Sequence, residues 1–347
     1  MLDTTEYTAA GGRAPSAAGP PLPRPRGPLS GAVLEALTTG CGRRLRPVEP
    51  PLLTGDRALS DEDLQLALYA AYELHYRGFA GVAPAMEWDP DVIRLRARLE
   101  ALFLAGIIDA VGPPPAGCDA RAELVALATS GGGPSLSDHV ARTSGRDELA
   151  ELCIHRSAYQ LKEADPHTWA LPRLAGAAKA VMAHIQHDEY GAGSAPAMHS
   201  ALFAATMDAL GLDPSYGHYL DVIPGVTLAT VNLISMLGLN RQWRNALVGH
   251  LALFEMTSVG PMSRYSRALE RLGLPPAARA FYDVHVEADA EHMELALDAM
   301  VAGLLAGEPE AAGEVVFGAR ALTELERRFT SHVLGSWAAG RSSLLAR

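Results

Sequence analysis

Three side chains with metal-binding chemistry recur at helical spacing in the last quarter of the chain. His285, Asp289 and His292 stand at positions i, i+4 and i+7. An α-helix turns by about 100° per residue, so the three side chains lie within roughly 60° of one another on one helix face. Apolar and small residues continue this face as far as Ala299. We therefore expect the face to point into the protein interior.

Two imidazoles and a carboxylate on a buried face require compensation, because unpartnered polar groups cost several kcal/mol in an apolar interior. A metal ion supplies it, and mixed nitrogen and oxygen donors suit iron, manganese or zinc. The alternative is a helix whose polar residues are satisfied by ordinary hydrogen bonds. For three donors in register we favour the metal.

A centre with two metal ions needs further carboxylates from facing helices. Glu255 is the only acidic residue between Asp221 and Glu270, within an otherwise apolar helical segment. Glu189 and His199 flank a stretch with two glycines and a proline, which must break a helix. The spacing of Glu189 and His199 does not by itself show that they converge, and His199 could equally be an ordinary core histidine.

Helical patterns dominate the elements that must position these side chains. Ser60 and Asp63 form a capping-box pattern that opens a helix to about residue 79, and Asp89-Pro90 opens a second helix to about residue 108. Alternating β-branched runs are nearly absent, so we predict an all-α fold. The remaining helices are predicted at 119–130, 146–164, 172–190, 197–211, 224–238, 241–259, 276–305 and 311–338.

The domain organisation follows from composition. Residues 1–55 are rich in proline, glycine and alanine, and we predict a largely disordered N-terminal segment. Residues 56–347 show no repeat and no linker, so we predict one helical domain there.

The combined pattern resembles the haem-oxygenase-like di-iron oxidases, also described as iron-containing redox enzymes. The pattern comprises Glu189, His199 across a glycine-rich break, the isolated Glu255 and the HxxxDxxH of residues 285–292. The phrases at 72–79, 163–169 (Glu-Ala-Asp-Pro-His-Thr-Trp) and 188–191 also match, and the resemblance covers most of residues 60–340. It implies a haem-oxygenase-like helical bundle.

The resemblance also implies a function. Two Fe(II) ions per chain would be bound by six ligands, with O2 as co-substrate and an external electron donor. The activity would be an O2-dependent oxidation of a small amine- or carboxylate-bearing molecule, by N-oxygenation or by oxidative C–C cleavage or decarboxylation, in natural-product biosynthesis. The six ligands would be Glu189, His199, Glu255, His285, Asp289 and His292.

Basic side chains on helical segments could hold a substrate carboxylate, since an arginine offers a planar bidentate fork. Arg264 is the first candidate, followed by Lys162 and Arg156. For each of them a structural salt bridge, for example with Glu163 or Asp165, is an equal alternative.

Composition limits the other partners. The formal net charge of −11 argues against nonspecific nucleic-acid binding. The three cysteines are odd in number and far apart, which favours a reducing cytoplasm. We expect no membrane span, a small-molecule substrate and a reductase or chemical reductant, with a homodimer as one possible assembly.

Three other functions stay open. A ferritin-like protein would need two ExxH pairs on separate helices, and only residues 289–292 have a related form. A cofactor-free or haem-binding relative of the same fold is a second alternative, although several carboxylates make a poor haem pocket. A non-catalytic helical binding protein is the third.

Overall fold

The computed structural model describes residues 19–40, 55–130 and 135–346. Within these ranges the chain forms helices and turns and has no strand. The predicted all-α class is therefore confirmed. The prediction that residues 56–347 form one domain remains a prediction.

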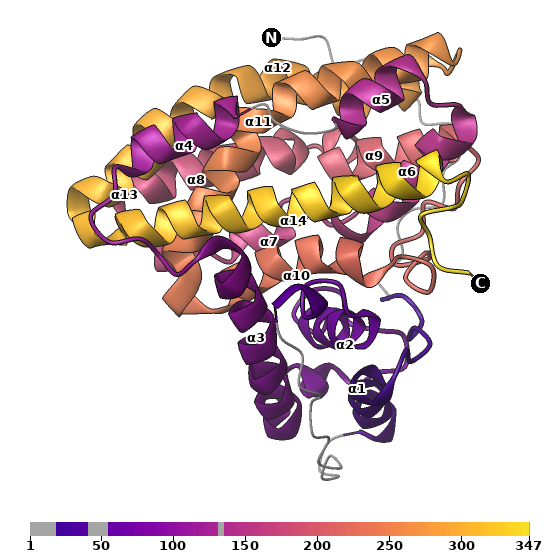
Figure 1. Cartoon of the computed structure of the whole chain (residues 1–347), viewed down its shortest axis with the longest axis horizontal. Coiled ribbons are helices and arrows are strands. Elements are labelled where there is room, and N and C mark those ends of the chain that lie inside the picture. Colours follow the sequence, from indigo (N-terminus) through magenta and orange to yellow (C-terminus); the bar gives the residue numbers. More distant parts are fainter. Residues whose placement is uncertain (1–18, 41–54, 131–134, 347) are drawn as a thin grey trace.

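A group of three helices lies at one end of the molecule, beneath α10 in Figure 1. They are α1 (Pro28–Thr39), α2 (Glu62–Glu73) and α3 (Pro90–Val111). The start of α1 is held by Asp63, whose carboxylate accepts hydrogen bonds from the backbone N–H groups of Leu29 and Ser30. Apolar residues of α1 are buried against α2.

The predicted disorder of residues 1–55 is therefore wrong for residues 19–40. Three leucines and a valine supply enough apolar surface to fix a short helix despite the surrounding prolines. Residues 1–18 and 41–54 lie outside the described residues.

The main bundle is built around α11, which packs along both α12 and α14. Two glycines allow the close approach of α11 and α14. A Cβ atom on Gly249 would lie 1.9 Å from the carbonyl oxygen of Val315, and one on Gly318 would lie 1.8 Å from that of Ala246. The bundle helices are α4 (Ala120–Thr129), α5 (Leu136–Arg142), α6 (Arg146–Gln160), α7 (Asp165–Thr168), α8 (Gly176–Glu189), α9 (His199–Ala209), α10 (Gly225–Leu239), α11 (Arg244–Arg271), α12 (Ala280–Glu294), α13 (Ala302–Gly307) and α14 (Ala312–Ala338).

Several helix boundaries differ from the prediction: α2 ends at Glu73 and not near residue 79, and α6 ends at Gln160 and not at residue 164. The cap of α2 is Asp61 and not Ser60, because the Asp61 carboxylate accepts from the backbone of Asp63 and Leu64. α11 continues through Pro261, since its packing on both neighbours outweighs one missing backbone hydrogen bond. α12 passes into a π-helix at Leu295–Val301.

None of the helices among the described residues is both long and apolar enough to span a bilayer.

Candidate metal centre

The side chains that converge in the bundle come from five places in the chain. Glu163 lies in the turn between α6 and α7, and Glu189 is the last residue of α8. His199 begins α9, and Glu255 lies in the middle of α11. The fifth place is α12, which carries His285, Asp289 and His292. All seven side chains are buried.

α12 buries its three potential metal ligands on one face, as the spacing in the sequence predicts. His285, Asp289 and His292 are buried on one face, whereas Glu287 and Glu291 are exposed. The hydrogen bond between His285 Nδ1 and the carbonyl oxygen of Phe281, at 2.6 Å, leaves Nε2 of that ring facing the cluster.

A glycine explains how Glu189 and His199 come together. The chain between them forms two short 3-10 turns, and Gly191 has a φ of 67° in the left-handed region. A Cβ atom on Gly191 would lie 2.5 Å from the backbone of Ala197 and Met198, so only glycine fits this fold-back. As a result His199 Nδ1 lies 2.8 Å from Glu189 Oε2.

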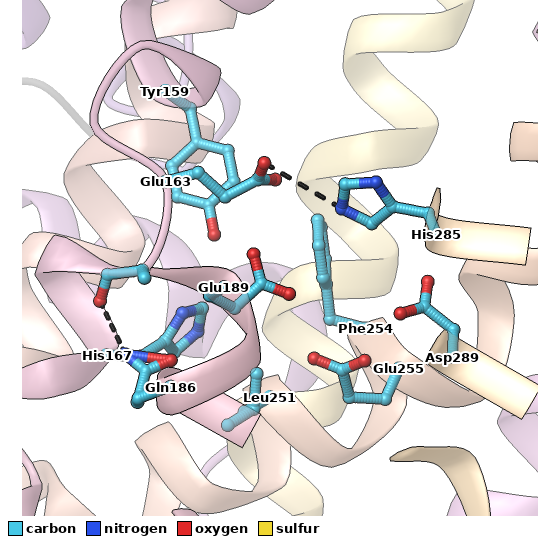
Figure 2. A pocket seen from close by; sticks show the side chains of 11 residues that line it. Tyr159, Glu163, His167, Gln186, Glu189, Leu251, Phe254, Glu255, His285 and Asp289 are labelled. Carbon is cyan, nitrogen blue, oxygen red and sulfur yellow. Dashed lines mark hydrogen bonds and ion pairs between the residues drawn. The ribbon is translucent and has the colours of Figure 1, made fainter. Parts of the chain in front are cut away.

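The donor atoms form two groups that share one carboxylate. Glu163, Glu189, His199 and His285 can place one donor atom each within 4.8 Å of one another, and so can Glu189, Asp289 and His292. Glu255 extends the second group, since its Oε2 lies 3.5 Å from His292 Nδ1. Figure 2 shows the carboxylates of Glu163, Glu189, Glu255 and Asp289 directed toward a common space. A shared Glu189 is the arrangement expected of a carboxylate that bridges two ions.

The charges in this space repel one another in the absence of a cation. Burial, together with the charges of Glu189, Asp289 and Glu255, holds the pKa of Glu163 well above its usual value. Burial and the neighbouring carboxylates raise the pKa of Glu255 to about 8. Burial acts to lower the pKa of His292, but the nearby carboxylates of Asp289, Glu255 and Asp188 raise it to about 11.

Several atoms of the cluster that could bind a metal ion have no hydrogen-bond partner. Both carboxylate oxygens of Glu163, Oδ1 of Asp289 and Nδ1 of His292 are buried and make no hydrogen bond, although His285 Nε2 lies 3.8 Å from Glu163 Oε2. Buried acceptors are nearly always satisfied in native proteins, so unpaired ones in one place call for an ion. Four carboxylates and three imidazoles fit iron, and the residues present therefore fit a pair of iron ions.

The structure thus brings all six predicted ligands together and adds Glu163, which was not among them. Glu163 lies in the phrase 163–169 that supports the family resemblance, and this was the available signal. It was missed because Glu163 follows Lys162 near a predicted helix end, where an ion pair between neighbouring side chains is the ordinary expectation.

None of the three predicted substrate-binding cations lines the cavity beside the cluster. Lys162 Nζ is buried and donates to Glu73 Oε2 at 2.9 Å. Arg156 forms two hydrogen bonds of 2.7 Å with Glu326.

Arg264 Nε lies 2.8 Å from Asp138 Oδ1, near the surface. Each cation is therefore held by an acid on another element, and none of these acids is the Glu163 or Asp165 considered from sequence. The geometry supports structural ion pairs in place of substrate contacts.

A small cavity lies against the cluster (Figure 2). Its other walls come from α6, α7, α8 and α11. They are formed by Tyr159, Ala164, His167, Gln186, Leu251 and Phe254. The Oε1 atom of Gln186 is buried and unpaired, while its Nε2 donates to the carbonyl oxygen of Ala164 and to Thr168. The wall facing the carboxylates is therefore aromatic and apolar with a few neutral polar groups.

Comparison with known proteins gives one family and a fold relative. The sequence model of a family described as iron-containing redox enzyme matches residues 150–327, which is just over half of the chain. The structure is similar to the crystal structure of a CADD-like protein of unknown function from Nostoc punctiforme PCC 73102, with a TM-score of 0.50 and 15% sequence identity, over 62% of this chain and 95% of that one. The search of curated proteins returned no match.

Proposed function

Because the chain belongs to the family of iron-containing redox enzymes and has a haem-oxygenase-like helical fold, we propose that it is a non-haem di-iron enzyme that activates O2. The observation that carries this proposal is the buried cluster of seven donor side chains, in which Glu189 belongs to both groups. One ion would be held by Glu163, Glu189, His199 and His285. The other would be held by Glu189, Glu255, Asp289 and His292.

The protein's own contribution is neutralisation, orientation and exclusion of water. The carboxylates offset the charge of the ions, and the Phe281 carbonyl orients His285. Tyr159 and Phe254 meet edge to face, with ring centroids 6.0 Å apart, and both line the cavity beside the cluster. Bound as a pair, Fe(II) ions would supply electrons for the reduction of O2, and an external donor would return them.

The substrate in this proposal is a small molecule that is oxidised at a nitrogen or at a carbon next to a carboxylate. The cavity favours the first of these reactions. Among the described residues that line it there is no lysine or arginine, whereas Gln186 Oε1 is a free acceptor. A hydrogen-bond acceptor and several carboxylates suit a substrate that carries an N–H donor better than a substrate that carries a further carboxylate. By family resemblance, we place the reaction in natural-product biosynthesis.

Anaerobic loading with Fe(II) tests the proposal. We expect about two irons per chain by elemental analysis and Mössbauer spectroscopy, and an O2-dependent change in the visible spectrum. His285→Ala should lose iron, whereas His187→Ala, at an exposed position of α8, should not. Wild-type protein that retains well under one iron per chain would refute the proposal. A Soret band with stoichiometric haem would favour the haem-binding alternative.

Substrate class is tested by O2 consumption of the iron-loaded protein. Matched pairs of alkylamines and fatty acids of equal chain length should be compared, with a chemical reductant present. We expect faster O2 uptake with the amines. Uptake that is stimulated only by the fatty acids would place the reaction at carbon.

A further inference from the structure

His292 differs from the other two histidines of the cluster in what its second nitrogen contacts. Its Nδ1 faces the cluster, 3.5 Å from Glu255 Oε2 and 3.6 Å from Asp289 Oδ1. Its Nε2 points the other way and lies 3.1 Å from Asp188 Oδ2. The His292 ring is buried, whereas the Asp188 side chain is about one-third exposed, with a relative accessibility of 34%.

We propose that Asp188 is a positioning residue for the ion held by Glu189, Glu255, Asp289 and His292. The Asp188 carboxylate accepts the hydrogen bond of His292 Nε2–H, so that Nδ1 presents its lone pair to the ion. A carboxylate in this place also makes the imidazole a stronger donor. This inference rests on the proposed function, because it assigns a role within the same metal centre.

The location of Asp188 on the helix supports this role. Asp188 directly precedes Glu189 at the end of α8, so one short segment supplies both a shared ligand and the partner of a ligand on α12. His184, one turn earlier on α8, approaches the same Asp188 oxygen at 3.8 Å and meets the His292 ring edge to face, with ring centroids 6.3 Å apart. His184 is half exposed, with a relative side-chain accessibility of 50%. Each of the three side chains therefore contacts the other two, and His292 is the one that belongs to the cluster.

A merely structural tie between α8 and α12 would behave differently. Its loss would lower the stability of the fold but would leave the affinities of the two ions in the same ratio. A positioning role predicts instead that the two ions respond unequally, because the first group of donors does not include His292.

The test is a competition titration with a chelator, under anaerobic conditions with Fe(II), of the wild type, Asp188→Ala and Asp188→Asn. We expect Asp188→Ala to weaken the binding of one of the two iron ions about 10- to 100-fold, which is typical for loss of such a partner. The affinity for the other ion should stay within about twofold of the wild-type value. Asp188→Asn should lie between Asp188→Ala and the wild type. His187→Ala, at an exposed position of the same helix, is the matched control and should change the affinity of neither ion by more than about threefold.

The Co(II)-substituted proteins give a second measurement that is independent of activity. The exchangeable ring N–H protons of metal-bound histidines are shifted strongly in the proton NMR spectrum. We expect one of these signals to broaden by exchange with solvent in Asp188→Ala, because the proton on His292 Nε2 loses its acceptor.

Equal weakening of the affinities for both iron ions would overturn the inference. It would indicate that the substitution acts through Glu189, which belongs to both groups. Unchanged affinities together with an unchanged NMR spectrum would also overturn it. Failure of the wild type to bind any iron is a separate result that refutes the proposed function itself.

Discussion

Glu163 is the cluster carboxylate whose position depends on a turn and not on a regular helix. We expect Glu163→Gln to weaken iron binding by the group of Glu163, Glu189, His199 and His285 by at least about 10-fold, a loss comparable with that of an outer partner. Glu287→Gln, at an exposed position of α12, is the control and should retain both ions. Chelator competition measures both variants. Two irons bound with wild-type affinity in Glu163→Gln would remove this residue from the centre.

Although Glu163→Gln should weaken iron binding, it should stabilise the fold of the metal-free protein. Burial and nearby carboxylates raise the pKa of Glu163 in the folded state above its unfolded value. For an acid, such a shift costs nothing below the unfolded pKa of about 4.3 and destabilises the fold increasingly as pH rises toward the folded pKa. Glu163→Gln should therefore raise the melting temperature of the chelator-treated protein more at pH 8 than at pH 5. An equal or lower melting temperature at pH 8 would contradict the shift.

The sequence predicted the position of a side chain correctly where the periodicity of one regular helix determines the face on which it lies. His285, Asp289 and His292 could be assigned to one buried face because a regular helix connects them. The convergence of Glu189 with His199 depends on the left-handed conformation of Gly191 and on two irregular turns, which spacing does not specify. Glu163 depends on a turn that includes Ala164 at a φ of 73°, for which the sequence carries no signal.

At the scale of elements, the contact between α11 and α14 determines where Glu255 lies. A Cβ atom on Gly318 would lie 1.8 Å from the Ala246 carbonyl oxygen, so Gly318→Ala must push the two helices apart. We expect a loss of about 1–3 kcal/mol in the free energy of unfolding, as for other overpacked positions. Urea titration measures this loss.

Gly335 on the same helix is the matched control. A Cβ atom there meets nothing within 4 Å, and the residue is exposed. Gly335→Ala should therefore stabilise the protein by roughly 0.5–1 kcal/mol through helix propensity. A Gly318→Ala protein as stable as Gly335→Ala would show that the helices can separate without cost.

The ion pair between Lys162 and Glu73 connects α2 to the turn that carries Glu163. Both side chains are almost completely buried, with relative accessibilities of 1% and 0%, and Glu73 also accepts from Tyr216. Lys162→Met should lower the free energy of unfolding by about 3–5 kcal/mol, because it leaves a buried carboxylate without its cation.

The double variant Lys162→Met, Glu73→Gln should recover part of this loss in the same urea titration. A stable Lys162→Met protein with weakened substrate binding would restore the substrate-binding role that the sequence suggested.

The predicted helices were of the right type, but α1 and α5 were missed and several helix ends were inaccurate. Asp89-Pro90 marked the start of α3 correctly, since a capping aspartate and a proline in the first turn act locally. The helix predicted over 241–259 was too short, because α11 runs through Pro261 to Arg271 and its packing against two neighbours is not visible in the local sequence.

At the scale of the whole molecule, the cluster joins segments that are up to 129 residues apart, from Glu163 to His292. Ions bound there should stabilise the entire bundle, because the unfolded chain cannot assemble these donors. We expect a stabilisation of about 2.7 kcal/mol for each bound ion at a free ion concentration 100 times its dissociation constant. Thermal unfolding with Mn(II), which does not react readily with O2, against a chelator measures it. His285→Ala should show a smaller gain, because one of the two groups of donors loses a ligand.

The four carboxylates of the cluster also select ions by valence. When all are ionised and the imidazoles are neutral, their summed charge equals and opposes that of two divalent cations. A filled site is then electrically neutral in a medium that penalises net charge. Two divalent ions need no counter-ion from solvent, whereas a monovalent pair would leave an excess of negative charge and a trivalent pair would require additional anions.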